Sequence, residues 1–333
     1  MGRAGLRFRK GRPVLGTAWA NGDVGPVRAG RVPKEGLNGK KDELKNNGTR
    51  CPEDTIPIRR STVADGIEKQ QCYSYRKPQA HNYAIEHALV VYTAHEQILG
   101  AEATINVWKP SVETENEFSL AQISIKYGEH QDINIIKVGW HVLPSLYGDT
   151  KTRLYSYWTG DVSGETGCYN NICAGFLKAR REEIWGGALD HSISGGQQFH
   201  ITVNIAKGLG GHWWLKIGGN MVGSWTRDLF THMKNSASRV EWGGKVSNTR
   251  PENRHTRTWM GAGHFAEEKF GKASYFHNLQ VEDVNNQLMP VPLSSLLEKM
   301  TDENCYNIMP FAATSGHGTS FYYGGPGYSL QCP

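Results

Sequence analysis

A lysine on an alternating stretch is the first residue of this chain that could take part in chemistry. In the run IIKVGWHV, the period of two is typical of a β-strand and puts Lys137 and Gly139 on the same face. The opposite face holds apolar residues, Ile136, Val138 and Trp140. An ammonium group attracts anions and donates hydrogen bonds, and the glycine leaves backbone open to a bound molecule. The plainer interpretation is a solvated surface charge, the common role of a lysine.

A second lysine has the same kind of setting in RVEWGGKVSN. Alternation places Lys245 on one face with Gly243 and Glu241. Glu241 is a carboxylate that could act as a base, but it would lie about 13 Å from Lys245 along an extended strand. We therefore expect Glu241 to lie at the surface or to pair with a lysine.

The elements that must position these residues are strands. A turn at 147–149 leads from the first run into TRLYSYW, and further alternating stretches cover residues 103–108, 118–128, 199–206, 212–218, 239–248 and 273–281. Their spacing predicts an all-β protein, either a sandwich or a barrel. Two short helices are expected, over 226–233 and over 295–300, where Ser295 and Glu298 fit a capping box.

The charge of the chain is distributed unevenly. Of the net +5, residues 1–50 supply +8, from twelve Lys and Arg against four Asp and Glu, which leaves −3 for residues 51–333. A nearly neutral body without a basic stripe argues against a nucleic-acid partner. Residues 1–50 show little apolar periodicity and are predicted to be disordered. No apolar run is long enough to span a membrane, so no membrane partner is expected.

Six cysteines favour disulfides over a metal site. CYNNIC has no second Cys or His pair near it, so neither zinc nor any other cofactor is predicted. Residues 14–20 are too short an apolar run for a clear signal peptide, yet disulfides and a sequon at Asn47 suggest a secreted protein. The expected pairs are Cys168 with Cys173, Cys305 with Cys332 and, with less support, Cys51 with Cys72.

Several enzyme motifs lack their central residues. GAGHFA, at 261–266, has the glycine spacing of a dinucleotide loop but no following helix. His95 and Glu96 lack the second histidine of a zinc protease, and no GxSxG occurs. The thirteen histidines show no ligand spacing. Dinucleotide enzymes, zinc proteases and serine hydrolases are therefore disfavoured.

A series of longer motifs runs in order from Cys51 to Pro333: CPEDTIPIRR, INVWKP, FSLAQISI, VGWHVLPSLYGDTKTRLYSYWT, TGCYNNIC, GHWWLKIG, VGSWTRDLF, WGGKV, MGAGHFAEEKFGKASYF and FYYGGPG. This series resembles the plant neprosin family. The resemblance implies a secreted glutamic endopeptidase that cuts next to proline, with an activation peptide before a catalytic antiparallel β-sandwich of two large sheets. It divides the chain into a basic tail (1–50), part of an activation peptide (51–80) and a sandwich domain (81–333).

The two positions that the resemblance makes catalytic carry the opposite charge. The family's glutamates precede the Gly-Trp of one strand and follow the Gly-Gly of another, and the matching residues here are Lys137 and Lys245. In that family one carboxylate takes a proton from water and the other, protonated, stabilises the oxyanion. Two lysines about 5 Å apart would repel by roughly 3 kcal/mol, which lowers one pKa to about 8 and leaves both protonated at acid pH. An ammonium cannot accept a proton, so we expect no peptidase catalysis.

The first hypothesis is therefore a secreted binding or regulatory protein with a peptide or protein ligand. One alternative is an active endopeptidase that uses Glu241 or Asp149 as its carboxylate. Another is a lectin-like module for anionic glycans or peptides, with tryptophans 140, 158, 213, 214, 225 and 242 as stacking surfaces, although such tryptophans more often form a core. The residues expected to form or support the groove are Gly139, Trp140, Tyr147, Tyr157, Trp158, Glu241, Trp242, Gly243 and Gly244.

Overall fold

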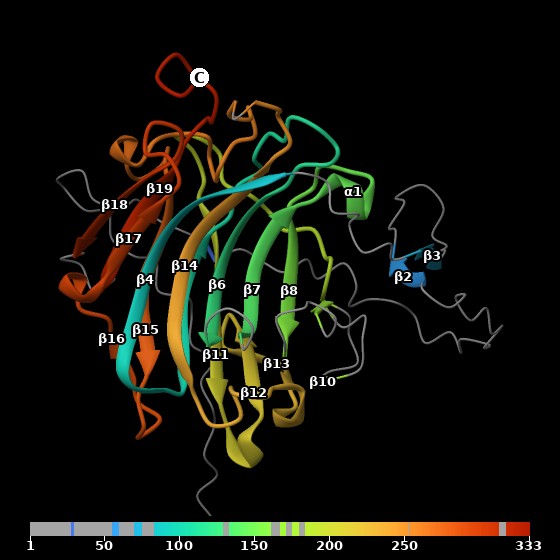
Figure 1. The fold of residues 1–333 in the computed structure, drawn as a ribbon, viewed down its shortest axis with the longest axis vertical. Coiled ribbons are helices and arrows are strands. Elements are labelled where there is room, and N and C mark those ends of the chain that lie inside the picture. Colours follow the sequence, from blue (N-terminus) through green and yellow to red (C-terminus); the bar gives the residue numbers. More distant parts are fainter. Residues whose placement is uncertain are drawn as a thin grey trace, which may run out of the picture.

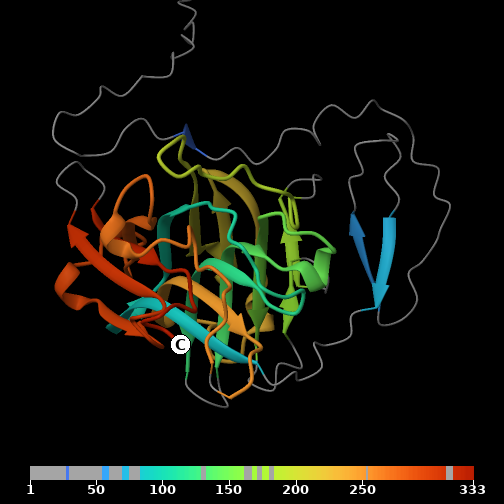
Figure 2. The same ribbon diagram turned by 90° about the horizontal axis from the view of Figure 1, so that it is seen from above.

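Two large antiparallel β-sheets pack face to face in the computed structural model (Figure 1, Figure 2), which confirms the predicted sandwich. The structure describes residues 83–128, 133–160, 167–170, 175–179, 184–252, 254–312 and 318–333. It also gives the backbone of β1 (Arg28–Ala29), β2 (Thr55–Arg59) and β3 (Gln70–Ser74). β2 and β3 pair antiparallel. Apart from β1, the tail 1–50 with its sequon at Asn47 lies outside the described residues, and the three domain boundaries stay predictions.

The seven-stranded sheet lies toward the viewer in Figure 1. In spatial order its strands are β17 (Leu297–Met300), β4 (Ala84–Ile98), β14 (Ala237–Asn248), β6 (Ser119–Tyr127), β7 (Asn134–Val142), β8 (Arg153–Thr159) and β9 (Cys168–Tyr169). Every neighbouring pair is antiparallel. β14 lies between β4 and β6, although it is far from both in sequence.

The second sheet lies behind the first. Its main path is β10 (Phe176–Lys178), β13 (Asn220–Trp225), β12 (Trp213–Ile217), β11 (Phe199–Lys207), β5 (Gly100–Asn106), β15 (Ser274–Glu282), β19 (Thr319–Gly324) and β18 (Asn307–Ala312). β16 (Leu288–Pro290) pairs with β15, and β1 lies parallel to β11. The six alternating stretches predicted outside the first hairpin correspond to β5, β6, β11, β12, β14 and β15.

Alternation along the strands builds the core between the sheets. The inner face of the seven-stranded sheet contributes Trp140 and Trp242, both 0% exposed, and the second sheet contributes Trp213 and Trp225, also 0% exposed. Trp158 belongs to the same core cluster. These five tryptophans pack against other side chains, so they form no stacking platform. Only Trp214, which is half-buried, differs among the tryptophans considered for a lectin-like surface.

The helical elements are few, and neither predicted helix forms over its expected range. The structure has α1 (Pro144–Tyr147) and the 3-10 turns η3 (Leu209–Gly211), η4 (Arg227–Leu229), η5 (Ala266–Glu268) and η6 (Leu293–Ser295). The helix expected over 226–233 is reduced to η4. Residues 297–300 instead form strand β17, because they add to the open edge of β4. No capping box forms, since the Ser295 hydroxyl donates to the carbonyl of Pro292 at 2.7 Å.

A disulfide joins Cys305 to Cys332, with 5.2 Å between the two Cα atoms. It ties the C-terminal segment to the loop before β18. Cys168 is also disulfide-bonded, whereas its expected partner Cys173 lies outside the described residues. Cys51, which was expected to pair with Cys72, also lies outside the described residues. None of the helices in the described ranges is long and apolar enough to cross a membrane.

Candidate functional site: a lysine-bearing sheet face

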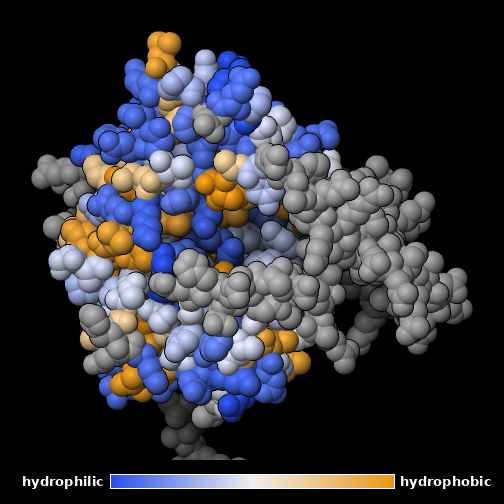
Figure 3. Space-filling model, in the orientation of Figure 1, coloured by the Kyte–Doolittle hydropathy of each residue, from blue (hydrophilic) through white to orange (hydrophobic). Residues whose placement is uncertain are grey.

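Strand register brings Lys137 and Lys245 to one face of the seven-stranded sheet, the face turned away from the core. Lys137 on β7 lies opposite Ser124 on β6, and Ser124 lies opposite Glu241 on β14. Lys245 follows Glu241 on the same face of β14. Both lysines are half-buried. On the side of the molecule shown in Figure 3, hydrophilic residues predominate and hydrophobic ones lie in scattered groups.

Two glycines leave part of the sheet surface between these lysines without side chains. Gly243, Gln122 and Gly139 lie side by side on β14, β6 and β7. A Cβ on Gly139 would lie 1.9 Å from the carbonyl oxygen of Ala121. Gly243 has φ of +143°, a conformation that favours glycine, and its Cβ would lie 2.1 Å from the carbonyl oxygen of Ala88. The only side chain of this row is therefore that of Gln122.

Gln122 and Ser124 are buried polar groups with unused donors. Gln122 is 1% exposed, and its Oε1 accepts a hydrogen bond from the hydroxyl of Tyr155 at 2.5 Å. Within the described part of the chain, the Nε2 of Gln122 and the hydroxyl of Ser124 have no partner. A buried donor without an acceptor costs about 1 to 3 kcal/mol, so this face is suited to a ligand that supplies acceptors.

Among the described residues of this face, Glu241 is the carboxylate nearest the two lysines, and it is already engaged in ion pairs. Glu241 is 3% exposed and forms ion pairs with Lys126 on β6 at 2.6 Å and with Arg239 on β14 at 2.8 Å. Burial opposes its ionisation, but the charge and hydrogen bond of Lys126, with the charges of Lys245 and Arg239, hold its pKa below the usual range. The expectation that Glu241 pairs with a lysine is met, although the residue is buried and not at the surface.

The two lysines differ in acidity. Burial, then the charges of Lys245 and Lys126, lower the pKa of Lys137 to about 7, against a smaller opposing effect of Glu241. Burial, then the charge of Lys126, lowers the pKa of Lys245 to about 8. No carboxylate pairs with either Nζ among the residues that the structure describes. At neutral pH Lys245 is therefore mostly protonated, while Lys137 is divided between amine and ammonium.

Aromatic rings border the lysines on the β8 side. The Nζ of Lys137 lies 5.2 Å from the centre of the Tyr157 ring, which in turn contacts Tyr169 at 5.0 Å. The rings of His141 and Tyr155 stack at 4.4 Å. Burial and the charge of Arg153 lower the pKa of His141 to about 3, so it stays neutral at physiological pH. The rings of this border are uncharged at neutral pH, and the nearby cation on β8 is Arg153, which is paired with Asp149.

Several predicted groove residues lie elsewhere. Trp140, Trp158 and Trp242 point into the core, because they alternate with the outward residues of their strands. Gly244 also faces inward, where a Cβ would meet Met260 and Tyr323. Tyr147 on α1 is buried beside His141, with ring centres 5.4 Å apart. Gly139, Tyr157, Glu241 and Gly243 lie on the outer face.

Asp149, the other carboxylate considered as a base, lies in the loop after α1 and not on the lysine-bearing sheet face. It forms an ion pair with Arg153 at 2.6 Å and accepts a hydrogen bond from the backbone of Lys151. Burial works against ionisation of Asp149, yet the contacts with Arg153 and Lys151 lower its pKa.

Sequence reasoning missed four residues of this face: Gln122, Ser124, Lys126 and Arg239. The sequence does group three of them: in FSLAQISIKYG, alternation places residues 122, 124 and 126 on one face of a strand. Their importance depends on β6 lying between β14 and β7. That neighbourhood is a property of the strand order, which periodicity does not give.

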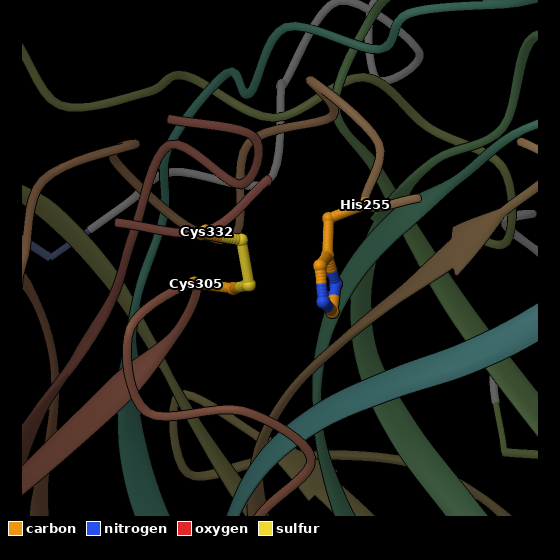
Figure 4. Close-up of side chains that lie close together, drawn as sticks. All are labelled: His255, Cys305 and Cys332. Atoms are coloured by element: carbon orange, nitrogen blue, oxygen red, sulfur yellow. A yellow bond between two sulfur atoms is a disulfide. The ribbon is translucent and has the colours of Figure 1, made fainter. Parts of the chain in front are cut away.

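One group in the described ranges has the spacing of a metal site, but its chemistry does not suit an ion. Ligand atoms of His255, Cys305 and Cys332 lie within 4.8 Å of one another. Figure 4 shows the two sulfurs joined in the disulfide beside the imidazole ring of His255. Disulfide sulfurs are not thiolate ligands. The ring of His255 instead contacts carboxylates, Glu86 at 3.1 Å and Asp302 at 3.6 Å.

Comparison with known proteins identifies the family. The Neprosin family model matches residues 115–326, which contain both lysine positions. The chain belongs to the Neprosin family. Among solved structures it is similar to Scytalido-glutamic peptidase bound to a peptide-based transition state analog, at 14% identity over 73% of this chain and 98% of that chain, with a TM-score of 0.38. It is also similar to SCP-B, a member of the Eqolisin family of peptidases in complex with the tripeptide Ala-Ile-His, at 12% identity over 73% and 98%, with a TM-score of 0.35.

Proposed function

We propose that this neprosin-family protein is not a peptidase and binds an anionic ligand, an acidic peptide or an acidic glycan, on the lysine-bearing sheet face. The observation that carries the proposal is the pair Lys137 and Lys245. By the resemblance of their motifs, both match the positions of the family's catalytic glutamates. Both are half-buried on the same face, and neither has a carboxylate partner in the described ranges. The expected secreted location places such a protein among extracellular peptides and polysaccharides.

The absence of peptidase chemistry follows from the need for a base. Hydrolysis by a glutamic peptidase requires a group that accepts a proton from water, and at acid pH both lysines are protonated and cannot do so. Glu241 is held by Lys126 and Arg239, and Asp149 is held by Arg153. Neither carboxylate is positioned to replace a member of the family's pair.

Anion binding follows from charge and from unused donors. Four cations, Lys126, Lys137, Arg239 and Lys245, surround one carboxylate on this face. Nε2 of Gln122 and the hydroxyl of Ser124 add neutral donors. A carboxylate ligand accepts several hydrogen bonds at once, and charge-assisted bonds are about twice as strong as neutral ones.

Peptidase activity is tested by restoring the glutamates. The processed protein and its Lys137→Glu, Lys245→Glu double variant are incubated at acid pH with a proline-containing peptide, and the products are identified by mass spectrometry. The proposal expects no cleavage by the natural sequence. Cleavage by the natural protein that survives removal of contaminating proteases would overturn it. Activity in the double variant alone would also locate the family's catalytic site.

Binding is tested with an oligo-glutamate peptide and an oligouronate, each against a neutral counterpart. Calorimetry should show binding of the acidic probe that weakens with salt. Affinity should fall as pH rises through about 7 and 8, because Lys137 and then Lys245 lose their protons. Lys245→Met should weaken binding at least tenfold, whereas Lys109→Met, at an exposed lysine, should not. Equal affinity for neutral probes would refute the assignment.

A further inference from the structure

The lysine face carries more positive charge than its acids neutralise. Glu241 is shared by Lys126 and Arg239, at 2.6 and 2.8 Å. This leaves Lys137 and Lys245 without a counter-charge in the described residues. An added carboxylate at this position would gain ion pairs and hydrogen bonds that the protein itself does not provide.

We propose that Lys137 is a site of reversible carbamylation by carbon dioxide, and that Lys245, Gln122 and Ser124 hold the carboxylate that forms on its Nζ. The proposal goes beyond anion binding and uses the same face. It assigns a covalent modification to a residue at which the family has a glutamate.

The reaction balances without an oxidant or a reductant. The lone pair of the uncharged Nζ attacks the carbon of CO₂, a nitrogen–carbon bond forms, and one carbon–oxygen π pair moves onto oxygen. The nitrogen then loses a proton to water, which gives an N-carboxylate with one negative charge. In acid the nitrogen is protonated again, the new bond breaks and CO₂ leaves. Carbon dioxide is the only co-reactant.

Lys137 meets the two requirements of this reaction, an uncharged amine and nearby cations. Burial and the charges of Lys245 and Lys126 lower the pKa of Lys137 to about 7, so the amine is available near neutral pH. Lys245, with a pKa lowered to about 8, keeps its proton in the same range. The groups around Lys137 on this face are Lys126 and Ser124 on β6, Tyr157 on β8, and Arg239, Glu241 and Lys245 on β14.

The neutral donors lie on β6, the strand that pairs with β7 beside Lys137. Ser124 is directly opposite Lys137 in register, and Gln122 is directly opposite Gly139, on the same face. Ser124 is 0% exposed and Gln122 is 1% exposed. The hydrogen bond from Tyr155 engages Oε1 of Gln122 and so assigns Nε2 as the free donor. A carbamate oxygen would satisfy both donors, which have no acceptor in the described part of the chain.

The carbamate does not recreate a glutamate. Its carboxylate is attached to Nζ and is therefore several bonds farther from the backbone than a glutamate carboxylate. Bicarbonate is accordingly not expected to produce peptidase activity. Because the carbamate occupies the anion-binding face, it should compete with an acidic peptide for that face.

The experiment uses the full chain with carbon-13-labelled bicarbonate at mildly alkaline pH. Carbon NMR should show a carbamate resonance, separate from bicarbonate, that disappears on acidification and returns on neutralisation. Lys137→Met should abolish the resonance, and Lys109→Met should retain it. Absence of the resonance in the natural protein, or its persistence in Lys137→Met, would overturn the proposal.

A second measurement does not depend on how the variant folds. A trialkyloxonium reagent converts carbamates of the natural protein to stable esters, and peptide mapping then locates the tag. The tag is expected on Lys137, and tags confined to other lysines or to the α-amino group would contradict the assignment. The two proposals fail separately. Binding of oligo-glutamate in CO₂-free buffer, together with no carbamate in labelled bicarbonate, refutes carbamylation alone. A carbamate in labelled bicarbonate, together with no oligo-glutamate binding in CO₂-free buffer, refutes the anion-binding function alone.

Discussion

Glu241 controls the electrostatics of the lysine face. It is nearly inaccessible and contacts two cations, so its removal leaves Lys126 and Arg239 without a counter-charge. Breaking a buried ion pair by removing one partner costs on the order of 3 kcal/mol. Lys137 and Lys245 add to the uncompensated charge.

We therefore expect Glu241→Gln to lower the free energy of unfolding by about 3 kcal/mol in a urea titration at neutral pH. Because the folded-state pKa of Glu241 is depressed, its stabilisation is present above the unfolded pKa of about 4.3 and is lost as pH falls through the folded value. The difference between the two proteins should thus shrink in acid. Glu303→Gln, at an exposed glutamate, should change little, and equal effects of both substitutions would contradict this account.

At the residue level, sequence reasoning identified Lys137, Lys245 and Glu241 and their common faces. Alternation fixes which side of its own strand a residue occupies, and this much is local. Whether Glu241 pairs with Lys126 depends on β6 being the neighbour of β14, which is a long-range fact. The burial of the tryptophans, by contrast, could be predicted locally, because the alternation that puts Lys137 on the outer face puts Trp140 in the core.

Among the elements, β14 depends on a glycine that no other residue can replace without strain. Gly243 combines φ of +143° with a Cβ position 2.1 Å from the carbonyl oxygen of Ala88 on β4. Gly219, in the turn between β12 and β13, has φ of +77° but open space around the Cβ position.

Gly243→Ala should cost on the order of 3 kcal/mol or more, because backbone strain adds to a clash with a paired strand. Gly219→Ala should cost only about 1 to 2 kcal/mol, the penalty for a left-handed backbone alone. Thermal unfolding of the two variants measures the difference. A comparable loss in both would show that the close approach of β4 is unimportant.

The strands with clear alternation were predictable, and those that depend on a partner were not. Residues 297–300 carried a helical signal in Ser295 and Glu298, yet they form β17 because β4 offers unpaired backbone groups at its edge. The turn at 147–149 was expected, but the single helical turn α1 before it was not. It begins at Pro144 and ends at Tyr147, because the next residue, Gly148, has a left-handed conformation.

For the molecule as a whole, the disulfide between Cys305 and Cys332 closes a loop with a sequence separation of 27. In the chain-entropy description such a loop stabilises the folded state by about 3.5 kcal/mol.

Replacing both Cys305 and Cys332 by Ala should therefore lower the free energy of unfolding by about 3.5 kcal/mol. The measurement is a denaturant titration of the oxidised proteins. Since Cys168 is also disulfide-bonded, adding a reductant should destabilise the natural protein further than this double variant is destabilised. An unchanged midpoint in the variant would mean that the cross-link does not limit the unfolded chain.

The position of β14 between β4 and β6 has a consequence for synthesis on the ribosome. When residues 84–142 have emerged, β6 and β7 can pair, but β4 and β6 each keep an open edge until residues 237–248 arrive. Open edges invite pairing with other chains, and late long-range pairing slows folding. A nascent chain stalled before residue 237 would hold only Lys137 of the two lysines and would expose both edges of β4 and one edge of β6. We expect such a chain to bind chaperones that shield unpaired strands.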